Sequence, residues 1–329
     1  GFYFILGGLS AWIMIPYSDS TGIIFPVFLF WLYVKLKETE SAKKKCVLLF
    51  LMFFLCYIGF EIKPMAAIVM IAVAAVEGIH FIGKLLKKQI VWKKSVLACC
   101  LSAVLGIGAA AGGVSAVVDS LHFPVVTDTV LGWQHHMMLG LNKDTNGGYS
   151  QADFDYSTSF SSAEEQHAAE LKEIGKRLKD FGVGGYLQHF VKKSARNYFD
   201  GCFGWGGLGE TFYTEIFPER GTVLCSLIRS LYYDNTEDTL YRYQALFRQI
   251  LWYMVLVLVP FSVFTKRPLD KKRQVAVLSV LGLMLYLQIF EAHARYLYTF
   301  VPIFVFLATE GIDNLRKYLN QKSERRVKK

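Results

Sequence analysis

Residues 131–142 read LGWQHHMMLGLN and lie inside a long, mostly polar segment, residues 119–246. Five apolar runs precede this segment and three follow it. A connection of this length carries either structure of its own or a function. We therefore expect residues 119–246 to form a folded cap on one side of a membrane, over a polar site at the helix ends.

The apolar runs are long enough to cross a membrane. Of the 329 residues, 53% are hydrophobic and 19% are charged, whereas a soluble domain is usually about 25% charged. A helix needs roughly 20 apolar residues to cross the hydrocarbon core. The sequence therefore predicts an all-α polytopic membrane protein with about eight transmembrane helices, at residues 1–16, 21–36, 46–61, 64–83, 95–118, 247–265, 274–290 and 296–313.

These runs divide the chain into four parts. Residues 1–118 hold the first five predicted spans, 119–246 the cap, 247–313 the last three spans, and 314–329 a basic tail. The chain begins at Gly1, inside the first predicted span, with no initiator Met and no signal-peptide pattern. We therefore expect further sequence upstream of Gly1.

Lysine and arginine residues predict the orientation of the chain. They concentrate in the connections 35–45, 84–94 and 266–273 and in the tail 314–329, all of which fall on one side of an eight-span arrangement. The positive-inside rule assigns that side to the cytoplasm. The cap and the C-terminus are thus predicted to be extracytoplasmic and cytoplasmic, respectively. This topology also explains the net charge of +9, so nucleic acid is not an expected partner.

The six cysteines show no metal-ligand spacing. Cys202 and Cys225 share the long polar segment and could pair if that side of the membrane is oxidising.

Two helices are predicted inside the cap. Ser162 and Glu165 fit a capping box, and an apolar stripe at helical spacing runs from Leu171 to Phe181 before Gly182 ends the helix. A second helix, at about residues 186–199, carries Lys192, Lys193 and Arg196. It could lie at the lipid headgroups, or it could be a packed helix with a solvated charged face.

Charged residues mark the predicted outer ends of the spans. Asp19 either caps a helix or presents a carboxylate that holds a divalent cation or an acceptor hydroxyl. Lys63 either pairs with Glu61 or meets a lipid-linked phosphate as a point charge. Arg295 suits a phosphate because its planar fork binds two oxygens.

Neighbours of these residues complete the candidate site. Glu291, His293 and Arg295 occupy alternate positions before Tyr296, and the segment could instead be a headgroup anchor with tyrosine in the aromatic belt.

The cap supplies a second group of candidates. His135 and His136 are adjacent, so a shared metal site is less favoured than a hydrogen-bonding histidine. Asn142, Tyr149 and Asp153 suit contacts with sugar hydroxyls, as many loop residues do.

Several short motifs together resemble those of bacterial membrane glycosyltransferases of the GT-C superfamily. The motifs are the Tyr17-Ser18-Asp19 turn, Lys63-Pro64 at the start of a span, and Glu291, Arg295 and Tyr296 near the end of one. The nearest resemblance is to the Gram-positive group related to glycosyltransferase family 39 and the protein mannosyltransferases. That group is similar in a Met-Met-Gly-Leu-like run, here Met137 to Asn142, and in a Gly-Gly-Tyr-Ser run from Gly147 to Asp153.

The resemblance implies transfer of a sugar from a polyprenyl-phosphate-linked donor to a cell-envelope glycan, lipid or protein. Asp19 and Glu291 would be catalytic. Arg295, Lys63 and Tyr296 would bind the donor phosphate, with Lys192 and Lys193 nearby. His135, Asn142, Tyr149 and Asp153 would contact the sugar or acceptor. A divalent cation, Mg²⁺ or Mn²⁺, is the candidate cofactor, with Asp19 as its candidate ligand.

One departure from the family pattern is serious. The acidic pair of the first outer loop, the family's best-known catalytic position, would precede Gly1. The alternatives are a transporter or lipid-linked glycan flippase, which predicts ionisable residues in the middle of spans, and a non-enzymatic cell-envelope scaffold. Here the charges lie at span ends, and only Glu77 falls deep within a run.

Overall fold

A computed structural model describes the chain except for residues 90–93, 123–130, 209–221, 234–238, 266–267 and 328–329. Every regular element in the described part of the chain is a helix. Apolar runs form helices in hydrocarbon because a helix satisfies its backbone hydrogen bonds internally. The predicted all-α polytopic fold is confirmed.

Seven helical segments among the described residues are long and apolar enough to cross a membrane. They correspond to the second through eighth predicted spans. Their helices are α1 (Ser18–Gly22) with α2 (Ile24–Glu38), α3 (Ala42–Ile62), η3 (Pro64–Ala67) with α4 (Ile68–Leu86), α5 (Lys94–Ser120), α11 (Thr239–Leu258) with η6 (Val259–Ser262), α12 (Lys271–Ile289), and η7 (Ala294–Phe300) with α13 (Val301–Val327). α13 continues without a break through the predicted start of the tail.

The prediction of an uninterrupted helix over residues 1–16 is wrong. This segment forms two short helices, η1 (Phe4–Gly8) and η2 (Ala11–Met14), and the backbone between them is extended at Ser10. Consecutive glycines weaken a helix because they lose the most conformational freedom on folding, and Gly7 and Gly8 lie just before the break. Hydropathy detects the apolar composition of the segment but not this break.

Arg248 of α11 stabilises the broken end of η1. Its guanidinium donates hydrogen bonds to the carbonyl oxygens of Ile5 at 3.1 Å, Leu6 at 2.9 Å and Leu9 at 2.9 Å. Carbonyls at the end of a helix have no partner within it, and here a side chain from a distant span supplies one. Arg248 is buried, so the charge is surrounded by the oxygens that it binds.

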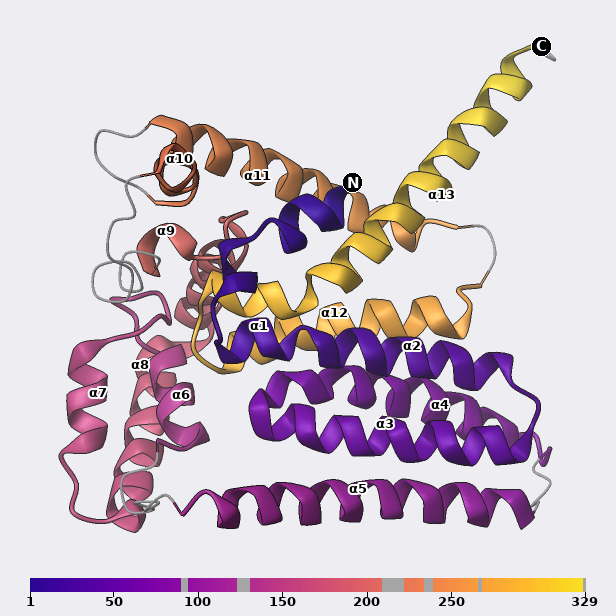
Figure 1. The fold of residues 1–329 in the computed structure, drawn as a ribbon, viewed down its shortest axis with the longest axis horizontal. Coiled ribbons are helices and arrows are strands. Elements are labelled where there is room, and N and C mark those ends of the chain that lie inside the picture. The colour runs from indigo at the N-terminus through magenta and orange to yellow at the C-terminus, as the bar shows by residue number, and fades with distance from the viewer. Residues whose placement is uncertain (90–93, 123–130, 209–221, 234–238, 266–267, 328–329) are drawn as a thin grey trace.

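The cap helices lie at one end of the spanning bundle (Figure 1). α6 (Trp133–Gly140), α7 (Gln151–Thr158) and α8 (Ala163–Tyr198) gather at the end where α1 lies, and the turn between α2 and α3 lies at the opposite end. The bundle core joins segments far apart in sequence, with Trp12, Tyr33, Trp252 and Phe300 fully buried. Which end faces the cytoplasm stays a prediction from the positive-inside rule.

The two predicted cap helices are joined at a kink within α8. Ser162 caps the start of α8 by accepting a hydrogen bond from the Glu165 N–H, as expected. Gly182 has φ 56° and ψ −178°, which interrupts the helical backbone where the sequence predicts an end. A residue other than glycine is strained at this positive φ. Met138 and Ile174 belong to a small separate core within the cap.

The cap is docked on the end of α12 by hydrogen bonds to backbone carbonyls. The Lys193 amine donates to the carbonyls of Gly140 at 2.9 Å and Gln288 at 2.8 Å. The Ala292 N–H donates to the Gly147 carbonyl at 2.7 Å. Lys193 is fully buried, so it lies neither at the lipid headgroups nor on a solvated face. This corrects both readings of the helix at residues 186–199 for this lysine.

Candidate functional site

Asp19 lies at the centre of a buried charged cluster at the cap end of the bundle. It occupies the first turn of α1, and its side chain is 0% exposed. Its carboxylate contacts the Lys63 amine, with Oδ1 to Nζ at 2.5 Å, and the Arg295 guanidinium, with Oδ2 to Nε at 2.9 Å. Tyr17, not Asp19, occupies the N-cap position of α1. The carboxylate therefore forms ion pairs where the simplest reading of the sequence had a helix cap.

Three separate elements bring these charges together. Lys63 is the extended residue between α3 and η3, where Pro64 starts the next helix. Arg295 is the second residue of η7, and its N–H donates to Nδ1 of His293, which caps that helix. Each of the three residues lies at the start of a helix or at the junction between two helices. The structure thus joins Asp19, Lys63 and Arg295, as the sequence predicts.

Aromatic rings surround the two cations. The Arg295 guanidinium carbon lies 4.7 Å from the centroid of the Tyr17 ring and 5.8 Å from that of Trp12. The Lys63 amine lies 4.6 Å from the centroid of the Tyr296 ring. Such cation–π contacts strengthen where water is excluded. The rings thus help to hold the two cations in place.

Glu291 forms a second acidic centre that touches the cap. The Tyr296 hydroxyl donates to its Oε2 at 2.8 Å, and the His136 Nδ1 lies 3.7 Å from the same oxygen. The His136 side chain is 47% exposed, whereas that of Glu291 is 11% exposed. A carboxylate that holds an accessible imidazole is an arrangement suited to moving a proton.

Burial and charge set the protonation of the groups outside the spans. Burial lowers the pKa of the Lys63 amine, and the Asp19 charge offsets this only in part. Burial would raise the pKa of Glu291, but the contacts with His136 and Tyr296 outweigh it and lower that pKa. Burial and the Arg295 charge lower the pKa of His293 to about 4. His293 is therefore neutral near pH 7 and can accept the Arg295 N–H.

The residues around Asp19 do not fit a divalent cation. Mg²⁺ and Ca²⁺ require several oxygen ligands, whereas both oxygens of this carboxylate face Lys63 or Arg295. Among the described residues, no group of three or more His, Cys, Asp and Glu side chains could hold a metal ion. Two fixed positive charges repel a cation, and the same charges favour an anion.

A comparison with known protein families identifies the chain as an integral membrane protein. A family model described as a conserved hypothetical integral membrane protein matches residues 5–314. The chain belongs to this family. No curated protein and no solved structure matches it. As a member of an integral membrane family, the protein contacts the lipid bilayer.

The residues predicted to contact a sugar lie within the cap and are separate from the Asp19 cluster. His135 is buried and its Nδ1 lies 2.7 Å from the Ser157 hydroxyl. Asp153 accepts a bidentate pair of hydrogen bonds from Arg177 at 2.8 and 2.9 Å and a third from Asn142 at 2.9 Å. These three predicted residues are therefore already bonded inside the cap.

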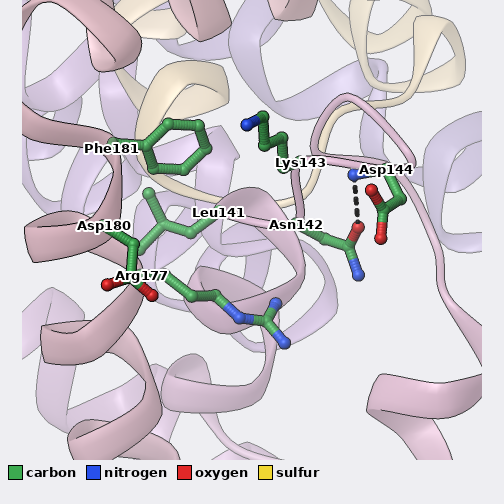
Figure 2. A pocket seen from close by; sticks show the side chains of 7 residues that line it. All are labelled: Leu141, Asn142, Lys143, Asp144, Arg177, Asp180 and Phe181. Carbon is green, nitrogen blue, oxygen red and sulfur yellow. Dashed lines mark hydrogen bonds between the residues drawn. The ribbon is translucent and has the colours of Figure 1, made fainter.

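Tyr149 is the exposed member of the predicted group. Its side chain hydrogen-bonds to Gln151 at 2.7 Å. A separate hollow of about 230 Å³ opens on the cap, and Figure 2 shows Phe181 and Lys143 on one side of it and Asn142 with Asp144 on another. The Asp144 N–H donates to the side-chain Oδ1 of Asn142 at 3.0 Å. A sugar-binding role for these residues stays a prediction.

Of the two adjacent histidines, His136 contacts Glu291, a contact that the sequence did not predict. His135 points into the cap and His136 points toward Glu291. Successive helical residues point about 100° apart, so one of the two had to face away from the site. Which one faces it depends on how α6 docks against the bundle, and the sequence carries no signal for that. Trp12 was also missed, since it lay inside the expected first span.

The remaining cap predictions have mixed outcomes. Cys202 and Cys225 are both free in the structure. Lys192 is exposed on α8, whereas Lys193 is bonded to backbone carbonyls and is not available to a donor phosphate.

Proposed function

We propose that this protein transfers a sugar from a polyprenyl-phosphate-linked donor to a cell-envelope acceptor at the membrane face that carries the cap. The observation that supports the proposal most is the buried trio of Asp19, Lys63 and Arg295 at the cap end of the spans. A polyprenyl tail stays in the bilayer, and its phosphate sits at headgroup depth. Two cations at that depth fit a phosphate that gains charge as the sugar leaves.

The geometry of Arg295 supports a role in binding an anion. Its Nε and Asp19 Oδ2 are 2.9 Å apart, yet neither atom has an aligned hydrogen bond within the described part of the chain. A buried polar group without a hydrogen bond calls for an explanation, and a ligand is one. In our proposal Asp19 orients Lys63 and Arg295 while the terminal nitrogens of Arg295 bind the phosphate oxygens.

The proposed reaction is a displacement at the anomeric carbon. The acceptor hydroxyl oxygen forms a bond to that carbon, and the bond from the carbon to the phosphate oxygen breaks. The phosphate keeps the electron pair next to Lys63 and Arg295. The hydroxyl proton passes to the His136 imidazole, which Glu291 orients across 3.7 Å. Tyr296 links the two halves, because its hydroxyl bonds Glu291 and its ring contacts Lys63.

The transporter alternative gains no support from Glu77. This residue bonds Lys37 at 2.9 Å and Lys271 at 2.7 Å, and it accepts a hydrogen bond from the Tyr33 hydroxyl. Lys37 lies at the end of α2 and Lys271 at the start of α12. Glu77 is thus held at the end of the bundle opposite the cap, and it is not a midplane site for a transported ion.

The test is transfer from defined lipid donors by the purified protein in vesicles. A panel of undecaprenyl-phosphate hexoses is offered with a cell-envelope extract as acceptor. We expect Arg295→Ala to lower transfer by about 10²–10³-fold, Arg295→Lys to retain part of it, and the exposed control Lys179→Ala to match the parent. If the parent transfers no sugar from any donor, the proposed function is wrong. If the parent is active and Arg295→Ala is unchanged, the phosphate role is wrong.

A further inference from the structure

One helix of the cap presents an apolar face that no described part of the protein covers. α10 (Val223–Tyr232) has the pattern of an amphipathic helix, with apolar residues at positions 223, 224, 227 and 228. Val223 is 88% exposed and Leu224 65%, and Leu227 and Ile228 are each about half exposed. Large apolar side chains gathered in this way usually mark a binding surface.

α10 is fixed to the rest of the protein at the end that carries Tyr232. Thr222 caps its start by accepting a hydrogen bond from the Cys225 N–H. At the other end, the Tyr232 hydroxyl donates to the Leu9 carbonyl at 2.9 Å, and its carbonyl accepts the Trp205 indole N–H. The helix is therefore held in one orientation, and the direction of its apolar face is a property of the fold.

The orientation of α10 fits a membrane surface. Figure 1 shows α10 nearly end-on, whereas α11, α12 and the other spanning helices run across the view. A helix that is perpendicular to the spans lies parallel to the membrane plane. α10 also contacts α11, the span that begins at Thr239. α10 is thus located where a span enters the bilayer on the cap side.

α11, which α10 contacts, also exposes apolar side chains. Tyr243, Phe247 and Ile250 of α11 are 69%, 53% and 51% exposed, as expected for residues that face lipid. Because α10 packs against this span, a bilayer that surrounds the start of α11 would also reach α10, and lipid is the occupant that fits its apolar face. Amphipathic helices of this type bury their apolar face about 5–10 Å into the boundary between headgroups and acyl chains.

We propose that α10 is a membrane-surface helix, with Val223, Leu224, Leu227 and Ile228 inserted into the leaflet on the cap side. This proposal does not depend on the reaction proposed above. It has a consequence for the site, because Trp205 packs edge-on against Trp12 with ring centroids 5.3 Å apart. Trp12 in turn lies beside Arg295. The lipid surface, through α10 and these two rings, sets the height of Arg295 relative to the headgroups.

A pair of tryptophan substitutions tests the proposal in the full-length protein. Leu224→Trp places an indole on the apolar face, and Ser226→Trp places a matched indole at an exposed polar position of the same helix. Both variants are reconstituted in vesicles of phosphatidylcholine brominated near the headgroup end of its chains. The emission of the parent, which has six tryptophans, is subtracted.

We expect brominated lipid to quench the added emission of Leu224→Trp at least about twofold more than that of Ser226→Trp. Aqueous iodide is expected to show the opposite order. Equal quenching of the two variants by brominated lipid overturns the proposal. Protection of Leu224→Trp from both quenchers also overturns it, because a protein partner would then cover the face. Val223→Trp gives a second reading on the same face if Leu224→Trp does not fold.

Discussion

The ion pairs of Asp19 allow a sharp test of the site's structure. Asp19→Asn keeps the size of the side chain and removes its charge. The parent carboxylate is 0% exposed and lies 2.5 Å from Lys63 Nζ and 2.9 Å from Arg295 Nε. Without it, two buried cations face each other, and the nearest remaining carboxylate that acts on both, Glu291, is engaged with Tyr296 and His136. Breaking a buried ion pair by removing one partner costs about 3–5 kcal/mol, so we expect a loss of that size in the free energy of unfolding.

A double-mutant cycle separates the ion pair from general damage. We expect Lys63→Met combined with Asp19→Asn to be less destabilising than the sum of the single changes, with a coupling energy of about 0.5–3 kcal/mol. The measurement is unfolding of the detergent-solubilised protein, followed by tryptophan fluorescence. The control is the exposed pair of Glu38 and Lys272, 2.8 Å apart with side chains 45% and 37% exposed, where coupling should be about 0–1 kcal/mol.

Two results would refute this reasoning. One is strict additivity of Asp19→Asn and Lys63→Met, which would mean that the two side chains do not interact in the folded protein. The other is a loss for Asp19→Asn no larger than that for Glu38→Gln, which would mean that Asp19 is reached by water. Either result would also remove the main support for the proposed phosphate site, since that site requires the three charges to be held together.

Three further predictions concern the cap and how it is docked. Burial lowers the pKa of Lys193 to about 7, against an ordinary 10.5. Between these two pH values the unfolded state binds more protons than the folded state, so the free energy of unfolding rises with pH by up to about 5 kcal/mol. Lys193→Met should lose this rise. A Cβ at Gly140 would lie 2.7 Å from the backbone oxygens of Ile289 and Phe290, so Gly140→Ala should destabilise docking by about 1–3 kcal/mol and speed hydrogen exchange in α6, whereas Gly175→Ala, in open space, should not. Asp153→Asn loses charged hydrogen bonds from Arg177 and should destabilise the cap by about 1.5–3 kcal/mol; unchanged hydrogen exchange in α7 and α8 would contradict it.

Much of the fold was predictable because membrane insertion depends on composition. Hydropathy located the second through eighth spans, since the cost of exposing backbone to lipid forces any long apolar run to be helical. Capping chemistry located the start of α8 at Ser162 and its interruption at Gly182, because both signals are local. The break within residues 1–16 was predictable only in part. Gly7 and Gly8 are a local signal for it, but the hydrogen bonds that Arg248 supplies come from a distant part of the sequence.

The part of the candidate site that lies at the ends of the spans was predictable, because the position of a residue along its span determines which residues of other spans lie near it. Asp19, Lys63 and Arg295 belong to three different spans, and they meet because each lies where its span reaches the cap end of the bundle. Roles inside the cap were not predictable, because they depend on how the cap helices pack. Lys193 looked like a surface charge and is fully buried, and Asp153 looked available to a ligand and is held by Arg177.

The contact of Arg248 with η1 has a consequence for biogenesis. Chains emerge from the ribosome N-terminus first, so the carbonyls of Ile5, Leu6 and Leu9 enter the membrane long before their partner at position 248 has been synthesised. Hydrocarbon offers those oxygens no substitute donor. The first segment therefore reaches its final shape only when α11 is inserted. Trp12 of the same segment lies beside Arg295, so the wall next to this guanidinium takes its final form only after α11 has been inserted.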